Sequence, residues 1–305
     1  MERGDIDASL VVRLLEAQFP EWAGLPIAPV ELAGWDNVTF RLGQDMSVRL
    51  PSGDPYSSQV AKEHRWLPVL AGHLPVTIPQ PLAEGAPGCG YPWPWSVYRW
   101  LPGACATVDR VADRTALARS VGAFLVALHA VDPAGGPPAG RDTQYRGGPL
   151  TVLDPWTRQT VAYLAGGVDA GAVTEVWEAA LAATWEGPPV WFHGDVSASN
   201  LLVVDGALSA VIDFGCSGVG DPACDLAIAW TFFADDDRRA FQESVPVDGA
   251  AWARGRGWAL WKALITHAEA LRLHRAVDAA GLQYGWRQPA CAVIDDVVAD
   301  HRMQR

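Results

Sequence analysis

The sequence is short of positive charge. Its 305 residues include 23 Lys and Arg against 35 Asp and Glu, which gives a formal net charge of −12 at pH 7. A nucleic-acid-binding domain presents a basic face, so this deficit argues against nucleic acid as a partner. An acidic balance is compatible with attracting a cationic small molecule, and it also serves solubility alone.

Long apolar runs and paired cysteines are missing too. No stretch reaches the roughly 18 uncharged apolar residues of a membrane span, and Met1–Asp7 contains no basic segment leading into an apolar one. The five cysteines are scattered, without a C-x-x-C pair, as is typical of reduced thiols. These absences predict a cytoplasmic protein with no membrane partner, and they leave its oligomeric state open.

A dense group of polar residues stands out between residues 193 and 213. His193-Gly194-Asp195 leads to Asn200, and Asp213-Phe214-Gly215 begins thirteen residues after that asparagine. Phosphoryl transfer from a nucleotide needs a group that orients the attacking hydroxyl, and it needs ligands for magnesium on the phosphates. An Asp, an Asn five residues later and a second Asp can supply these groups.

The spacing of these residues has a structural reason. The apolar runs 201–204 and 208–212 flank an Asp-Gly pair, which is a strong signal for a two-residue hairpin. Closing this hairpin would bring Asp213 back beside Asn200. Two oxygen ligands would then suit a hard cation that keeps water and phosphate as its other ligands.

Three segments together resemble the aminoglycoside phosphotransferase family: His193–Asn200, Val211–Gly215 and Gly218–Ala227. The resemblance is strongest over residues 190–230 and continues more loosely from about residue 27 to the C-terminus. It implies a protein-kinase-like fold and a kinase that uses ATP or GTP with Mg²⁺ to phosphorylate a small-molecule hydroxyl.

The resemblance does not identify the substrate, because the family also contains macrolide, choline, homoserine, methylthioribose and fructosamine kinases. The acidic balance of the chain slightly favours an aminoglycoside. A substrate site rich in tryptophan, involving Trp230, Trp258 or Trp261, would favour a macrolide instead.

The resemblance also implies roles for residues in the catalytic segment. Asp195 would be the catalytic base or a carboxylate that orients the hydroxyl, and Asn200 and Asp213 would be the magnesium ligands. Three further residues would be structural: His193 holding the loop by hydrogen bonds, Gly215 permitting a backbone turn, and Asp225 bracing the loop backbone.

On the nucleotide side, Arg49 occupies the strand position where many family members have Lys. Arg stays charged and can grip phosphate oxygens with two N–H groups. Glu63, in the following helix, is its expected ion-pair partner. Gly34–Thr39 takes the place of the nucleotide loop but lacks G-x-G-x-x-G, and within it we assign Asn37 to phosphate binding.

The segment Tyr98–Gly103 has the form of a strand followed by a Pro-Gly hinge. A purine would be bound there by main-chain hydrogen bonds, with Arg99 and Leu101 as the expected contributors. Leu202 and Ile212 would close the other face of the base.

These elements predict an α+β, two-lobed architecture. Residues 1–100 would form a small β-rich nucleotide-binding lobe, and residues 101–305 a larger, mainly helical lobe for catalysis and substrate binding. The predicted helices cover residues 7–19, 57–71, 117–130, two within 155–186, 222–233, 249–279 and 289–302; the predicted strands include 27–33, 38–42, 47–50, 95–100 and 190–192.

Two questions stay open at this level. Asp235–Asp237 is either an anionic lid over the amino groups of a substrate or a solvated turn that caps the next helix; Glu269, Asp154, Asp295 and Asp296 are comparable candidates. Arg49 and the glycine-poor loop also admit a nucleotide-binding pseudokinase, although a pseudokinase has no need of the complete Asp195, Asn200 and Asp213 set.

Overall fold

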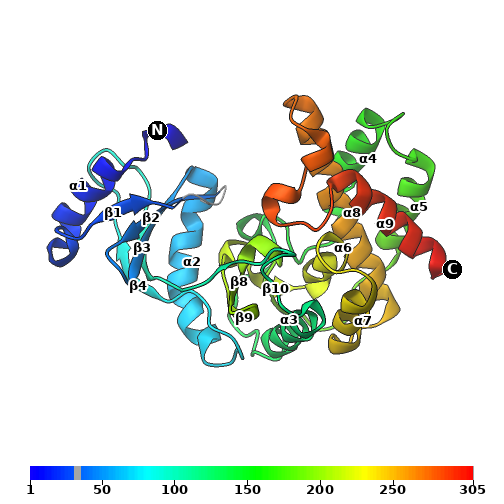
Figure 1. Ribbon diagram of the computed structural model, residues 1–305, viewed down its shortest axis with the longest axis horizontal. Coiled ribbons are helices and arrows are strands. Elements are labelled where there is room, and N and C mark those ends of the chain that lie inside the picture. Colours follow the sequence, from blue (N-terminus) through cyan, green and yellow to red (C-terminus); the bar gives the residue numbers. More distant parts are fainter. Residues whose placement is uncertain (31–35, 305) are drawn as a thin grey trace. The chain divides into compact units, whose positions relative to one another are not determined.

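The chain divides into two compact units in a computed structural model that describes residues 1–30 and 36–304 (Figure 1). The first unit comprises Met1–Gly72 and Thr77–Pro102, and the second comprises His73–Val76 and Gly103–Arg305. The predicted residues Gly34 and Trp35 of the nucleotide loop, and the end of the predicted strand 27–33, lie outside the described residues.

The first unit is built on a five-stranded antiparallel sheet in the order β1-β2-β3-β5-β4. Its strands are β1 (Ile27–Pro29), β2 (Asn37–Leu42), β3 (Met46–Pro51), β4 (Pro81–Gly85) and β5 (Trp95–Arg99), and its helices are α1 (Ala8–Gln18) and α2 (Asp54–Ala71). Asp7 caps α1 as predicted, accepting the Leu10 amide at 2.8 Å. Strand β4 was not predicted, because its surroundings are rich in proline. It lies at the edge of the sheet, where a proline need not donate to the ladder.

The second unit is mainly helical. Its helices are α3 (Arg114–His129), α4 (Asp154–Tyr163), α5 (Ala170–Ala182), α6 (Ile228–Thr231), α7 (Asp235–Ser244), α8 (Gly249–Arg272) and α9 (Ala290–Met303). Its short strands are β6 (Ala104–Cys105), β7 (Val190–Phe192), β8 (Leu201–Val204), β9 (Ala207–Val211) and β10 (Gly218–Gly220), which form the sheets β6-β8-β9 and β7-β10. The predicted helix 222–233 is instead a 3₁₀ helix, Pro222–Ala227, followed by the short α6. None of the helices described in either unit has both the length and the apolarity required to cross a membrane.

Helix α8 organises the second unit, since it packs against α5, α9 and the 3₁₀ helix Pro222–Ala227 (Figure 1). Near its start, Arg254 forms a bidentate pair with Asp221, with Nε–Oδ2 and Nη2–Oδ1 distances of 2.7 and 3.2 Å. The same guanidinium donates to the carbonyls of Ala183 and Thr184 at 3.3 and 3.2 Å. Both charged side chains are buried, so this pair ties the segment after β10 to α8.

We expect Arg254→Met to lower the free energy of unfolding by about 3–5 kcal/mol, because it leaves the buried Asp221 carboxylate without its cation. Arg239→Met is the matched control, since the Arg239–Asp236 pair is 70% and 83% exposed and should contribute little. Urea denaturation followed by circular dichroism measures both changes. Equal losses in the two variants would contradict the prediction.

Candidate active site

The β8–β9 hairpin brings two of the predicted metal ligands together. Its turn residues Asp205 and Gly206 both have positive φ, 51° and 79°, which is the geometry expected for a two-residue Asp-Gly turn. The Ile212 amide donates to the Asn200 carbonyl at 2.9 Å, so Asp213 comes one residue after the position opposite Asn200. Asp213 itself adopts the left-handed conformation (φ 68°).

Asn200 is bonded to Asp195 twice. Its Nδ2 donates to the Asp195 carbonyl at 2.9 Å and to Oδ2 of the Asp195 carboxylate at 3.1 Å. Because the amide nitrogen is turned to Asp195, the amide oxygen Oδ1 is the Asn200 atom that can serve a hard cation. The loop therefore presents a carboxylate and a carboxamide side by side.

Lys262 of α8 is a member of the site that no motif predicted. Its ammonium lies 2.5 Å from Oδ1 of Asp195, whose side chain is 35% exposed. Burial alone would raise the pKa of Asp195, but the charge and hydrogen bond of Lys262, together with the charge of Arg146, lower that pKa to about 2. Asp195 is thus an ionised carboxylate that accepts one hydrogen bond on each oxygen.

A buried network holds the loop backbone. Asp225 accepts the amide of His193 on Oδ2 at 2.8 Å and the amide of Gly194 on Oδ1 at 2.7 Å. The Nδ1 atom of His193 accepts the Asp195 amide at 3.2 Å, so the ring proton is on Nε2, which donates to the Ile212 carbonyl at 3.1 Å. Burial lowers the pKa of His193 and raises that of Asp225 to about 7. A neutral His193 therefore links the loop to the end of the hairpin.

Two backbone positions in this segment are conformationally demanding. Gly194 has φ +86°, and a Cβ atom there would lie 2.6 Å from the Cys216 carbonyl oxygen. The turn after the predicted metal ligand is made by Asp213 itself, and not by Gly215 as expected, because Gly215 lies within the 3₁₀ helix Phe214–Cys216 and does not have positive φ.

In the first unit, Arg49 and Glu63 form the expected ion pair, with 3.4 Å between Nη1 and Oε2. Tyr98 is a third member that sequence reasoning missed: its hydroxyl donates to the same Oε2, and the Arg49 Cζ lies 5.4 Å from the centre of its ring. Glu63 is almost fully buried. Burial is also the main reason that the pKa of Tyr98 is raised.

The other residues assigned to the nucleotide have varied surroundings. Asn37 is buried at the start of β2, where its carbonyl accepts Arg3 at 3.3 Å. The Arg99 amide already donates to the Gln80 carbonyl at 2.9 Å, so it is not available for a purine, and Leu101 is the better candidate for a main-chain contact. Leu202 lies buried in β8, and Ile212 is half-buried after β9.

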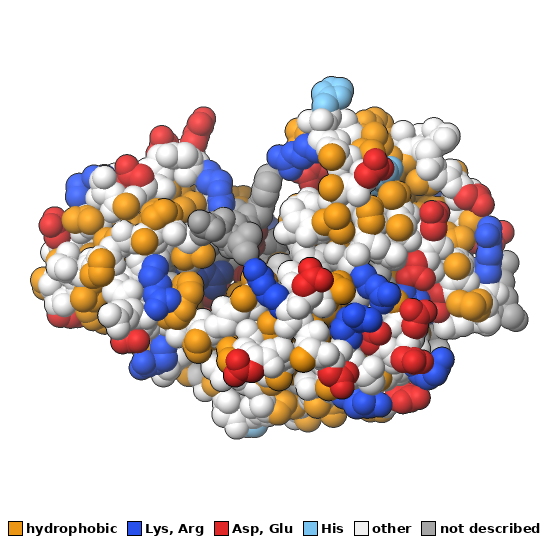
Figure 2. Space-filling model, viewed as in Figure 1, with side chains coloured by type: hydrophobic (Ala, Val, Ile, Leu, Met, Phe, Trp, Pro, Cys, Tyr) orange, Lys and Arg blue, Asp and Glu red, His pale blue; other side chains and the backbone are white. Residues whose placement is uncertain are grey.

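Most of the carboxylates considered for a cationic substrate meet arginines of the chain itself, and acidic and basic side chains intermingle over the second unit in Figure 2. Asp235–Asp237 forms the first turn of α7, and Asp237 caps it by accepting the Ala234 amide, as the capping interpretation predicts, although Asp237 is buried and not solvated. Asp154 pairs with Arg158, Asp235 with Arg287, Asp236 with Arg239, Asp237 with Arg114 and Arg287, and Asp296 with Arg238. The tryptophans considered for a macrolide site, Trp230, Trp258 and Trp261, are buried in packing.

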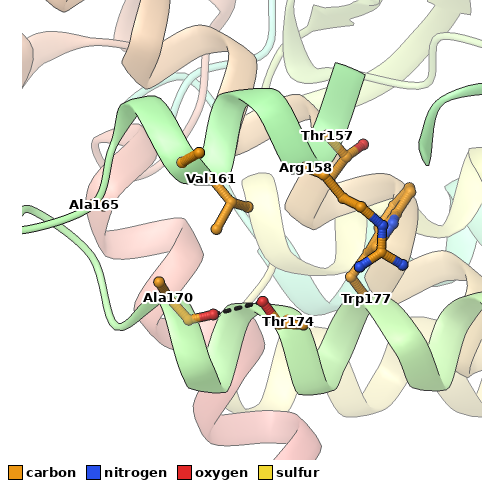
Figure 3. Close-up of a pocket in the computed structure, with 8 residues that line it drawn as sticks. Thr157, Arg158, Val161, Ala165, Ala170, Thr174 and Trp177 are labelled. Carbon is orange, nitrogen blue, oxygen red and sulfur yellow. Dashed lines mark hydrogen bonds between the residues drawn. The ribbon is translucent and has the colours of Figure 1, made fainter. Parts of the chain in front are cut away.

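Two small cavities lie in the second unit. One, of about 220 Å³, lies between α4 and α5 and is lined by Thr157, Val161, Thr174 and Trp177 among others (Figure 3). None of the predicted site residues lines this cavity. The other, of about 270 Å³, is lined by Thr266 and Glu269 of α8 together with Arg275 and Gln283. Glu269 therefore lies in the wall of this second cavity.

Comparisons with known proteins match this chain to phosphotransferases in both sequence and structure. Residues 27–258 match the family model described as the phosphotransferase enzyme family. An aminoglycoside 3′-phosphotransferase from Escherichia coli is 44% identical over 57 residues, which is 18% of this chain and about a fifth (21%) of that relative.

Solved structures share the fold over nearly the whole chain. The GDP and kanamycin complex of APH(2″)-IIIa has a TM-score of 0.72 at 19% identity, covering 95% of this chain and 98% of that one. A macrolide 2′-phosphotransferase from Brachybacterium faecium has a TM-score of 0.57 at 26% identity, covering 90% and 97%. The expected kinase-like α+β fold is thereby confirmed.

We expect Gly194→Ala to lower the free energy of unfolding by at least about 1–2 kcal/mol, because the new Cβ both opposes the positive φ and meets the Cys216 carbonyl. Gly249→Ala, at the start of α8, is the control, since a Cβ there meets nothing within 4 Å. Thermal unfolding of the two variants tests this. A Gly194→Ala protein as stable as wild type would contradict the conformation assigned to the loop.

Proposed function

The chain belongs to the phosphotransferase enzyme family, and from this premise we propose that it transfers the γ-phosphoryl group of ATP or GTP to a hydroxyl group of a small molecule. It is a small-molecule kinase. The observation that carries the proposal is the ionised Asp195 carboxylate, held beside Asn200 and the hairpin end that bears Asp213. The cytoplasmic location expected from the sequence stays a prediction.

Asp195 orients the acceptor. Each of its oxygens has two lone pairs and accepts one hydrogen bond, from Lys262 or Asn200, so lone pairs remain for the acceptor O–H. The acceptor oxygen forms the new bond to phosphorus, the bond from the γ-phosphorus to the nucleotide breaks, and the hydroxyl proton passes to Asp195. A carboxylate with a pKa of about 2 is a weak base. It therefore suits a loose transition state, in which positioning and charge neutralisation matter most.

We assign Asn200 and Asp213 as ligands of Mg²⁺. The donor set fits this ion, which takes one or two protein oxygens and completes its shell with phosphate and water. When bound, the ion would neutralise charge on the nucleotide phosphates.

We assign phosphate binding by Arg49 to the first unit, and catalysis, magnesium binding and the acceptor to the second, to which Leu202 and Ile212 also belong. Arg49 would bind phosphate oxygens, with Glu63 and Tyr98 holding its guanidinium. The remaining contacts are proposed for Asn37, the Leu101 main chain, Leu202 and Ile212. The nucleotides in the related structures, GDP among them, support this part of the proposal.

An aminoglycoside is the first candidate acceptor. The acidic net charge, the aminoglycoside 3′-phosphotransferase match and the kanamycin complex of a similar structure support it. A macrolide is the second candidate, because the macrolide 2′-phosphotransferase is 26% identical, against 19% for the kanamycin complex, and because most of the carboxylates considered for substrate amines are ion-paired internally. An amino-alcohol or sugar metabolite belongs in the same test.

We expect Asp195→Ala to reduce kcat by about 10²–10⁴-fold while nucleotide affinity stays near that of wild type, because only the orientation of the hydroxyl is lost. Turnover with ATP and GTP is measured against aminoglycosides, macrolides and amino-alcohols, and mass spectrometry identifies a phosphorylated product. Asp109→Ala, an exposed site in the same unit, is the control. Near-normal turnover in Asp195→Ala would exclude this role. A wild type that binds nucleotide but turns over no acceptor would favour the pseudokinase alternative.

We expect Asp213→Ala to weaken nucleotide binding by about tenfold or more when Mg²⁺ is present, because the ion loses its carboxylate ligand. Without Mg²⁺, wild type and variant should bind nucleotide alike. Calorimetric titration with Mg²⁺ and with EDTA separates the two cases. Identical titrations for both proteins in Mg²⁺ would remove Asp213 from the metal site.

A further inference from the structure

Lys262 reaches Asp195 from a distant part of the chain. The two residues are 67 positions apart, and the Nζ–Oδ1 distance is 2.5 Å. The lysine side chain is only 16% exposed, so the long aliphatic stem is packed and the ammonium is held at its partner. A contact of this kind restricts the rotation of the carboxylate, which Asn200 alone would fix through a single oxygen.

The choice of lysine at this position is itself informative. The sequence contains two lysines and 21 arginines, and Lys262 is the one lysine of the second unit. The other buried cations of α8 are arginines that spread over several acceptors: Arg254 bridges both oxygens of Asp221, and Arg256 meets Asp300 and Gln304 at 3.1 and 2.7 Å.

Geometry explains why an arginine would not serve at residue 262. A guanidinium is a planar fork that matches both oxygens of a carboxylate, whereas an ammonium is a compact point charge. A guanidinium bound to both oxygens of Asp195 would compete with Asn200 for Oδ2. It would also cover the lone pairs that the acceptor hydroxyl needs. An ammonium on Oδ1 supplies the charge and leaves those lone pairs open.

The position of Lys262 along α8 is well supported. Its neighbour Trp261 packs edge-to-face on Trp156 of α4 with ring centres 5.6 Å apart, and the Arg146 guanidinium lies 4.6 Å from the Trp261 ring centre. Arg146 also contributes positive charge toward Asp195. The helix is thus anchored one residue before Lys262, and the ammonium arrives at a defined place.

We propose that Lys262 is a positioning residue, whose ammonium holds Asp195 by one carboxylate oxygen so that the rest of the carboxylate stays open to the acceptor hydroxyl. The proposal rests on the proposed kinase function. Helix α8, which is distant from the catalytic motif in the sequence, would thereby help to orient the Asp195 carboxylate.

The first test compares Lys262→Met, Lys262→Arg and wild type. We expect kcat to fall about tenfold or more in both variants, with the KM for nucleotide unchanged, because only the placement of Asp195 is altered. Arg272→Met, on the exposed end of the same helix, is the control. Wild-type kcat in Lys262→Met would overturn the proposal, and wild-type kcat in Lys262→Arg would overturn the requirement for a single-oxygen contact.

A double-mutant cycle separates positioning from a general structural effect. In an Asp195→Asn background, Lys262→Met should cause little further loss of kcat, because the group through which it acts is already impaired. A loss as large as in the wild-type background would mean that Lys262 acts independently of Asp195, and would refute the proposal.

A readout without turnover distinguishes failure of this inference from failure of the proposed function. Lysine labelled with ¹³C at Cε gives two side-chain NMR signals in this chain, and Lys262→Met identifies one of them. Asp195→Asn should shift the Lys262 signal and leave in place the signal of the other lysine, Lys62 of α2. An unshifted Lys262 signal would overturn the pairing whatever the activity. A shifted signal in a protein that phosphorylates no acceptor would overturn the proposed function and, with it, the catalytic purpose of the pair.

Discussion

The second unit is arranged around one requirement, which is to keep a half-buried carboxylate both ionised and fixed in direction. Burial works against the charge on Asp195, the positive charges of Lys262 and Arg146 oppose that effect, and hydrogen bonds fix the direction of the carboxylate. Lys262 brings a positive charge from α8, Asn200 brings an amide from the same loop, and Asp225 holds the backbone on which the carboxylate is mounted. Removing any one of these residues would leave the direction of the Asp195 carboxylate less restricted.

The first unit solves a related problem with different residues. In the proposed nucleotide site, the Arg49 guanidinium on the central strand β3 is held in place and would still donate to phosphate oxygens. Glu63 provides the opposite charge from α2, and the Tyr98 ring provides a flat surface near the guanidinium while its hydroxyl shares the same carboxylate oxygen. The Arg49 guanidinium lies within cation–π distance of this ring, so the ring adds to the attraction of Glu63.

Contacts of the candidate site could be predicted from the sequence where the interacting residues are close together in the chain, and could not where they are far apart. The hairpin that joins Asn200 to Asp213 was predictable, because its turn residues and apolar runs are local. The contact of Asp195 with Lys262 was not, since a single lysine on an apolar helix face has no motif and only the folded helix places it. Strand β4 was missed for a different reason: prolines mask an edge strand from any pattern based on propensity.

The anchoring of α8 has a consequence for how the chain can vary in length. Arg254 fixes the helix to the segment after β10, and eight residues later Lys262 must point at Asp195. Each residue turns an α-helix by about 100°, so inserting or deleting one residue between these two positions would rotate one of them away from its partner. The number of helix residues between Arg254 and Lys262 is therefore fixed by the contacts at both ends. Insertions can be accommodated only outside this interval.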